Sequence, residues 1–307
     1  MTRSYPTHVV AGIAKGRRLE YWTLAWVATV IPLMFVVMGS SQAMKTVWIE
    51  DMLGFVPPLV FLLSARLERK APTATFHYGF DRANGVAFAV SAVALALMGV
   101  YLLFEAAMTL LMKEHPTVGT MRAFGRDIWM GWPMIAVLLW STIPSMVLGR
   151  MKLPLARTIN DKVLHTDADM QKADWMTGLA AIAGVIGIGL GYWWADAAAA
   201  GLISFGIIKD GVTDLRASSA ELIDGTPREL EGDKLSDEAK HLKARLNQLF
   251  PTAPVRLRET GRVIRAQVTG KAPAKPVDLD EIWPGDKDRA WRFAELSYVT
   301  TSVEKQH

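Results

Sequence analysis

The chain has 307 residues, of which 51% are hydrophobic, and its mean hydropathy is +0.19. These values predict membrane helices joined to a soluble part. The absence of cysteine excludes disulfides, thiolate metal ligands and cysteine nucleophiles. The net charge of +4 gives no indication of nucleic-acid binding. The polar N-terminal stretch runs to about Glu20, which is long for the n-region of a cleavable signal peptide, so none is expected.

Six apolar segments predict an all-α membrane bundle, because a bilayer core of ~30 Å needs ~20 apolar residues in a helix. In chain order they are Tyr21–Gly39, Val47–Leu63, Gly85–Met112, Ile128–Leu148, Trp175–Trp194 and the short Ala195–Ile208. Positive charges gather before the first, after the second and after the fourth segment. By the positive-inside rule, this multi-pass inner-membrane protein has both termini in the cytoplasm. These charges are Arg3, Lys15, Arg17, Arg18, Arg66, Arg69, Lys70, Arg82, Arg150, Lys152, Arg157, Lys162 and Lys172.

The C-terminal part has the composition of a soluble domain. We expect a membrane domain over residues 1–213 and a cytosolic domain over residues 214–307. The predicted elements of the second domain are a helix Ser236–Phe250, a hairpin Val255–Val268, a helix Asp286–Ala294 and a strand Glu295–Val303. This order favours a small α+β fold with one apolar sheet face.

Glu50 and Asp51 stand inside the second apolar segment. Carboxylates within a membrane are costly and are tolerated where they face a wet cavity or hold an ion. Neighbouring helical residues differ by ~100°, so both cannot point straight at one partner helix. The alternative is that they lie hydrated near the outer interface.

Four motifs resemble the cation diffusion facilitator family. Phe76–Ala83 (FHYGFDRA) resembles its HPYGxGRAE loop, and Trp193–Ala197 (WWADA) resembles its W-x-DP/DA turn. Glu221–Pro227 (ELIDGTP) resembles the LLDGTPD exit from its last helix, and Val255–Val268 resembles its cytosolic strand pair. These motifs occur in the family's order along essentially the whole chain.

The resemblance implies a homodimer in the lipid bilayer that exchanges divalent metal ions for protons. It implies a six-helix bundle with a C-terminal cytosolic α+β domain of the ferredoxin-like, metallochaperone-like kind. The transported ion is the substrate, and no resident cofactor is expected. Cation efflux by metal/proton antiport is therefore the expected function, without enzymatic activity: no catalytic Ser/His pair, phosphate-binding loop or HExxH motif is present.

The family's ion site uses two positions four residues apart on each of two helices. When the positions are counted from these motifs, they fall on Glu50 and Gly54 of the second helix and on Met170 and Asp174 of the fifth. Asp51 is the neighbour of the first of them. Two of the four therefore depart from the family's His and Asp pattern. We interpret the chain as an atypical member with altered transport-site ligands.

Two prolines suggest a replacement for the missing side chain at Gly54. Pro57 and Pro58 have no N–H, so the carbonyls of Leu53 and Gly54 lose their helical partners. A freed Gly54 carbonyl is a suitable ligand for a hard cation. The alternative is an ordinary proline kink.

The sequence leaves three candidates for the transported ion: iron, manganese and zinc. Without histidine, a carboxylate-rich site suits iron or manganese better than zinc. The Met170 thioether suits only soft ions, and the alternative is that it fills space. Leu164–Asp169 (LHTDAD) is either an inner gate that collects cations or a solvated helix start. Two rival functions remain: a transport-inactive partner or scaffold protein, and a transporter of another cation.

Overall fold

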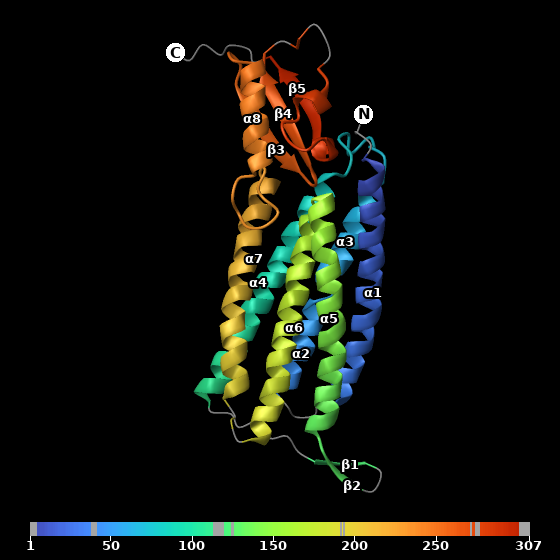
Figure 1. Cartoon of the computed structure of the whole chain (residues 1–307), viewed down its shortest axis with the longest axis vertical. Coiled ribbons are helices and arrows are strands. Elements are labelled where there is room, and N and C mark those ends of the chain that lie inside the picture. The colour runs from blue at the N-terminus through green and yellow to red at the C-terminus, as the bar shows by residue number, and fades with distance from the viewer. Residues whose placement is uncertain are drawn as a thin grey trace.

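The computed structural model describes residues 5–37, 42–112, 120–123, 126–190, 192, 194–270, 272–273 and 277–300. Long helices run along the long axis of the molecule, and a small sheet domain lies at the end where the chain begins (Figure 1). The helices of the bundle are α1 (Thr7–Val37), α2 (Gln42–Leu53), α3 (Val56–Leu67), α4 (Arg82–Leu111), α5 (Gly131–Ile159), α6 (Lys162–Gly189) and α7 (Ala195–Leu222). A hairpin of β1 (Thr120–Ala123) and β2 (Arg126–Trp129) lies at the other end (Figure 1).

The mostly helical class is confirmed. Within the described ranges, four helical segments are long and apolar enough to cross a membrane: Thr7–Val37, Val47–Leu67, Arg82–Leu111 and Gly131–Ile159. They overlap the first four predicted segments. The fifth and sixth predicted segments overlap α6 and α7, which are not among these four.

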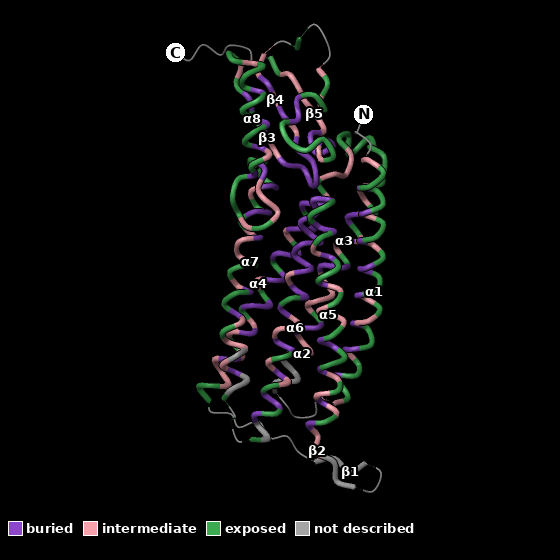
Figure 2. The backbone as a smooth tube through the Cα atoms, in the orientation of Figure 1, coloured by how far each residue is buried: buried purple, intermediate pink, exposed green. Residues whose placement is uncertain are grey.

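The surface of the bundle is apolar, as contact with lipid requires. Figure 2 shows exposed residues along the outer sides of the helices and buried ones in the centre. Trp22 of α1 is 64% exposed, Leu111 of α4 is 79% exposed and Leu202 of α7 is 76% exposed. In water such a surface would aggregate, so the environment of the bundle is a membrane.

Two polar residues make the turn between α5 and α6. Asn160 ends α5 in the left-handed conformation, with φ 50°, which is a common helix ending. Asp161 Oδ1 then accepts a hydrogen bond of 2.9 Å from the Leu164 N–H and starts α6. α5 therefore extends well past the predicted end at Leu148.

Because α5 is longer than predicted, two of the positive charges that the sequence places in the loop after the fourth segment lie elsewhere. Lys152 lies inside α5 and is fully buried, and Lys162 at the start of α6 is 3% exposed. Lys162 Nζ lies 2.6 Å from Glu259 Oε2 of the sheet domain. The sequence places both lysines in a loop after the fourth segment, but in the structure buried carboxylates hold them inside the protein.

The C-terminal domain is built from a helix and a three-stranded sheet in the part of the chain described. Its elements are α8 (Asp237–Leu249), β3 (Val255–Thr260), β4 (Val263–Thr269), α9 (Leu279–Ile282), the 3-10 helix η1 (Lys287–Arg292) and β5 (Phe293–Val299). β4 pairs antiparallel with β3 and parallel with β5. Leu242 and Leu246 of α8 pack on Ile264 and Phe293 of the sheet.

Two elements of this domain differ from the sequence-based prediction, while its expected start at residue 214 stays a prediction. The predicted helix Asp286–Ala294 is the short 3-10 helix η1, and the last strand begins earlier, at Phe293. Residues 301–303 of the predicted strand lie outside the described residues. α7 also continues past residue 213, where we expected the membrane domain to end, as far as Leu222.

The tip of the β3–β4 hairpin enters the end of the helix bundle. Gly261 makes the turn with φ 59°, and a Cβ there would lie 2.5 Å from the Asp81 carbonyl oxygen. Only glycine allows this approach. Arg262, the next residue, is 1% exposed and donates a 2.7 Å hydrogen bond from Nε to Asp161 Oδ2. Arg262 also pairs with Glu68, so one guanidinium binds the ends of two helical segments.

Glu68 shows how the buried cation is balanced at this junction. Burial raises the pKa of Glu68, and the Arg262 guanidinium opposes the rise. Asn84 Nδ2 of α4 donates a further 3.2 Å hydrogen bond to Asp161. The junction is therefore a closed network of charges whose members depend on one another.

We predict that Arg262→Met lowers the free energy of unfolding by about 3–5 kcal/mol, because it leaves Asp161 and Glu68 buried without their cation. Denaturant titration in mixed micelles measures the loss. Arg258→Met in the same hairpin is the matched control. The side chains of Arg258 and its partner Asp224 are both partly exposed, and Arg258 Nη1 lies 3.4 Å from Asp224 Oδ1. The control is expected to lose less than about 1 kcal/mol. Equal losses would contradict this account of the junction.

Candidate functional site

Glu50 and Asp51, near the end of α2, are buried inside the bundle, with exposed fractions of 1% and 5%. Thr177 Oγ1 of α6 donates a 2.7 Å hydrogen bond to Glu50 Oε1. Ser141 Oγ of α5 donates a 3.4 Å hydrogen bond to Asp51 Oδ1. The two carboxylates thus contact different helices, as their separation of ~100° requires. Their burial does not fit the alternative of hydrated groups at the outer interface.

Asp174 of α6 completes the group of carboxylates. Glu50, Asp51 and the Ser145 hydroxyl of α5 lie close enough to Asp174 to influence its charge. A Cβ placed on Gly54 would lie 3.8 Å from Asp174 Oδ2. The fold therefore brings Glu50, Asp51, Gly54 and Asp174 together from α2 and α6, although they are separated by more than a hundred residues in sequence.

A break in the second span lies at this point. α2 ends at Leu53 and α3 begins at Val56, with Pro57 and Pro58 in its first turn. The proline at 58 has no N–H for the Gly54 carbonyl, which therefore lacks its usual helical partner. Broken helices expose backbone carbonyls at the ion sites of many transporters.

Each of the three carboxylates has an oxygen that is shielded from solvent and has no hydrogen-bond partner. These oxygens are Glu50 Oε2, Asp51 Oδ2 and Asp174 Oδ1. A buried polar atom without a partner is costly, so such atoms are rare outside functional sites. A positively charged ligand would supply the partner that these oxygens lack.

Met170 has a different environment from the carboxylates. It is 1% exposed and packs with Leu95, Met98 and Leu102 of α4 and with Ile207 of α7. These neighbours are apolar, as expected for a side chain that fills space. A role for its sulfur as a ligand stays a prediction.

The carboxylates are close but do not form a ready-made ligand set. Among the described residues, no three histidine, aspartate or glutamate side chains lie close enough to hold one metal ion. An ion would therefore need the backbone carbonyl, the nearby hydroxyls or a small approach of α2 to α6 in addition to the carboxylates.

The LHTDAD segment does not act as one cluster. His165 Nδ1 lies 3.2 Å from Asp169 Oδ2, one turn along α6, and His165 Nε2 lies 3.7 Å from Glu231. Asp167 points elsewhere and pairs with Lys152 of α5. The segment therefore supplies two separate ion pairs at the start of α6.

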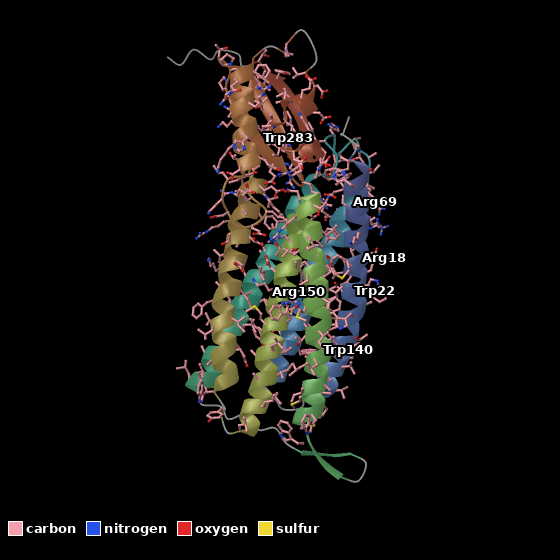
Figure 3. All side chains as sticks on the ribbon, in the orientation of Figure 1. Arg18, Trp22, Arg69, Trp140, Arg150 and Trp283 are labelled. Carbon is pink, nitrogen blue, oxygen red and sulfur yellow. The ribbon has the colours of Figure 1, made fainter. Side chains whose placement is uncertain are left out.

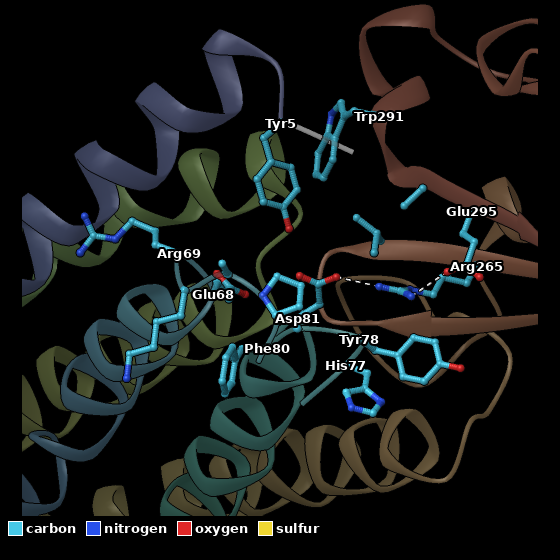
Figure 4. A pocket seen from close by; sticks show the side chains of 16 residues that line it. Tyr5, Glu68, Arg69, His77, Tyr78, Phe80, Asp81, Arg265, Trp291 and Glu295 are labelled. Atoms are coloured by element: carbon cyan, nitrogen blue, oxygen red, sulfur yellow. Dashed lines mark hydrogen bonds and ion pairs between the residues drawn. The ribbon is translucent and has the colours of Figure 1, made fainter. Parts of the chain in front are cut away.

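A large pocket of about 920 Å³ lies at the junction with the sheet domain, away from the carboxylates (Figure 4). Arg265 crosses one wall and bonds to both Asp81 and Glu295 at 2.7 Å. Tyr5 meets Trp291 edge-on, at 5.5 Å between ring centres. Burial raises the pKa of Tyr5 to about 12, so its hydroxyl stays neutral. This wall is held together by its own charges and rings.

Sequence reasoning missed the hydroxyl groups around the site. Ser141 and Ser145 are one turn apart on α5, and Thr177 follows Asp174 by one turn on α6. Helical spacing of small polar residues in otherwise apolar segments is a signal that could have found them.

Buried carboxylates at a break in an apolar helix define a membrane protein that moves cations. A family model, the cation efflux transmembrane domain, matches residues 21–223, which is more than half of the chain. The chain therefore belongs to this family, the cation diffusion facilitators, as its motifs indicated, and it transports cations across a membrane. Members of the family are transporters, and the absence of enzymatic activity stays a prediction. No curated protein matches the chain significantly.

We predict that Pro58→Ala weakens divalent-ion binding about tenfold, because an N–H at position 58 can hydrogen-bond to the Gly54 carbonyl and withdraw it from the site. Titration calorimetry with Mn²⁺ measures the affinity. Pro57→Ala is the matched control, since it offers its N–H to the Leu53 carbonyl instead. Unchanged affinity in Pro58→Ala would show that the kink is structural only.

Proposed function

We propose that the protein exports a divalent metal cation in exchange for protons, and that the ion binds between α2 and α6. The observation that carries this proposal is the set of three buried carboxylate oxygens without partners, on Glu50, Asp51 and Asp174. Asp174 and one or both of the neighbouring carboxylates supply the charge, and the Gly54 carbonyl supplies a neutral oxygen. A divalent ion compensates the negative charge that these groups gather inside an apolar bundle.

We propose that α6 and α7 also cross the membrane, which makes six spans when α2 and α3 count as one. Each has 28 residues. At ~1.5 Å per residue, this length exceeds a bilayer core of ~30 Å. Leu202 and Phe205 of α7 are 76% and 61% exposed, and Leu179 and Ile186 of α6 are 46% and 48% exposed, as lipid contact would explain.

We place the sheet domain and both termini in the cytoplasm of a cell with this transporter in its inner membrane. Figure 3 shows Arg18 and Arg69 toward the sheet-domain end, with Trp140 further from that domain. Positive charge at this end is what the positive-inside rule requires of the cytoplasmic side. We also propose that two copies form a homodimer, as family membership implies.

The proposed mechanism is alternating access. The cation binds from the cytoplasm and leaves on the opposite side, after which protons occupy the same carboxylates. Metal and proton compete because a carboxylate must lose its proton before it can bind the metal. The break between α2 and α3 lets the segment that carries Glu50 and Asp51 move relative to α6.

The oxygen-rich donor set favours Mn²⁺ or Fe²⁺ over Zn²⁺, since carboxylate and carbonyl oxygens suit the harder ions. A second candidate function is that of a transport-inactive partner or scaffold for another membrane protein. The specific observation in its favour is that Gly54 and Met170 replace two of the family's side-chain ligands. Ion binding by the purified protein distinguishes the two functions.

We predict that Asp174→Asn abolishes metal-dependent proton flux in proteoliposomes, because it removes a carboxylate central to the site. A pH-sensitive dye inside the vesicles measures the flux on addition of Mn²⁺ or Zn²⁺. Asp214→Asn on α7 is the matched control: Asp214 is a buried carboxylate that accepts a hydrogen bond from Thr166 instead. The control is expected to retain its flux, and undiminished flux in Asp174→Asn would remove Asp174 from the mechanism.

A further inference from the structure

Lys152 of α5 lies between two carboxylates from two other helices. Its Nζ is 2.6 Å from Glu20 Oε2 of α1, and it also pairs with Asp167 Oδ2 of α6. All three side chains are at most 1% exposed. We call Glu20, Lys152 and Asp167 the buried triad.

The buried triad carries one negative charge too many. One ammonium group stands against two carboxylates, and Glu20 Oε1 is buried without a partner. Lys152 and Asp167 are the charged groups that act on Glu20 in the part of the chain described. An uncompensated charge in a dry interior is costly, and one proton shared by the two carboxylates removes it.

Further polar side chains lie about one helical turn from the buried triad, on the ion-site side along α6. Gln171, one turn after Asp167 on α6, donates a 3.3 Å hydrogen bond to Thr23, one turn after Glu20 on α1. Ser145 Oγ of α5 donates a 3.5 Å hydrogen bond to the Gln171 carbonyl oxygen, three residues before Asp174 on α6. We call the buried triad together with Thr23, Gln171 and Ser145 the polar seam.

The polar seam is enclosed. Thr23, Gln171 and Ser145 are 2%, 3% and 1% exposed. Gln171 Oε1 is buried without a partner. A Cβ on Gly149 of α5 approaches within 3.2 Å of the Gln171 Cβ and 3.6 Å of its Oε1, so the glycine makes space for this amide. Apolar side chains at these positions would stabilise the fold at least as well, so stability alone does not explain the polar ones.

We propose that Glu20 holds an exchangeable proton while the ion site is free of metal and releases it when a divalent cation binds beside Asp174, with the polar seam as the route. The inference rests on the proposed function and adds a proton carrier outside the ion site. The O–H bond of the Glu20 carboxyl group breaks, its electron pair stays on the oxygen, and the proton passes along the polar seam to the ion site and from there to solvent.

Electrostatics couples the two positions. The charge of Asp167 acts on Asp174, so the buried triad and the ion site share one electrostatic environment. A divalent cation that displaces a single proton from the site carboxylates leaves one additional positive charge beside Asp174, and the triad then no longer needs its own proton. In Glu20→Gln, Lys152 and Asp167 form a neutral pair, and no proton is needed in either state.

The test counts protons released per bound ion. Mn²⁺ is titrated calorimetrically into the full-length protein in detergent, in buffers of different ionisation enthalpy. We expect Glu20→Gln to release about one proton fewer per Mn²⁺ than the wild type. Asp214→Asn, which removes a buried carboxylate outside the polar seam, is expected to release the wild-type number. An unchanged count in Glu20→Gln, with Asp174-dependent binding intact, overturns this inference alone.

Thr23→Val tests the route without changing a charge. In proteoliposomes it is expected to slow Mn²⁺-dependent proton flux at least about tenfold, since it breaks the contact with Gln171. Thr29→Val, on the same helix but bonded to Trp26 and Trp140, is the control and should keep its rate. Unchanged flux in Thr23→Val overturns the inference even where Glu20→Gln does not fold. Failure of the wild type to bind Mn²⁺ or Zn²⁺ would instead overturn the proposed function, and this inference with it.

Discussion

The compensation of charge inside an apolar bundle is the constraint on which this structure depends. Lys152 supplies one positive charge internally against Glu20 and Asp167, and Arg262 does so for Asp161. Glu50, Asp51 and Asp174 have no such internal cation among the described residues, and hydroxyl groups satisfy them only in part. This difference separates a buried carboxylate that supports the fold from one that is available to a transported ion.

The same helices connect the ion site to the sheet domain. α6 carries Asp174 at its centre, and at its start Lys162 pairs with Glu259 of the sheet domain. The turn before α6 holds Asp161, which accepts hydrogen bonds from Arg262 at the tip of the β3–β4 hairpin. A tilt of α6 relative to the sheet domain would break these buried ion pairs. In the proposed alternating-access cycle, the free energy of the transition would therefore include the cost of disturbing this junction.

Local patterns in the sequence predicted which of the candidate site residues the fold brings together, and their role as an ion site stays a prediction. The two prolines predicted the break at Gly54, and helical spacing with the family motifs placed Asp174 near Glu50. Tertiary pairing was beyond such patterns. Lys152 reads as a loop charge until α5 is seen to extend past it, because its partners lie on α1 and α6. The 3-10 helix at Lys287–Arg292 likewise depends on packing against the sheet rather than on its own periodicity.

The central claim is that carboxylates from α2 and α6 hold the transported cation between them. The most direct measurement is the anomalous scattering of Mn²⁺ in crystals of the full-length protein. The account predicts an anomalous peak within bonding distance of Asp174 and of Glu50 or Asp51, and its loss in the Asp174→Asn variant. A peak elsewhere in the protein, or one that survives this substitution, would contradict it.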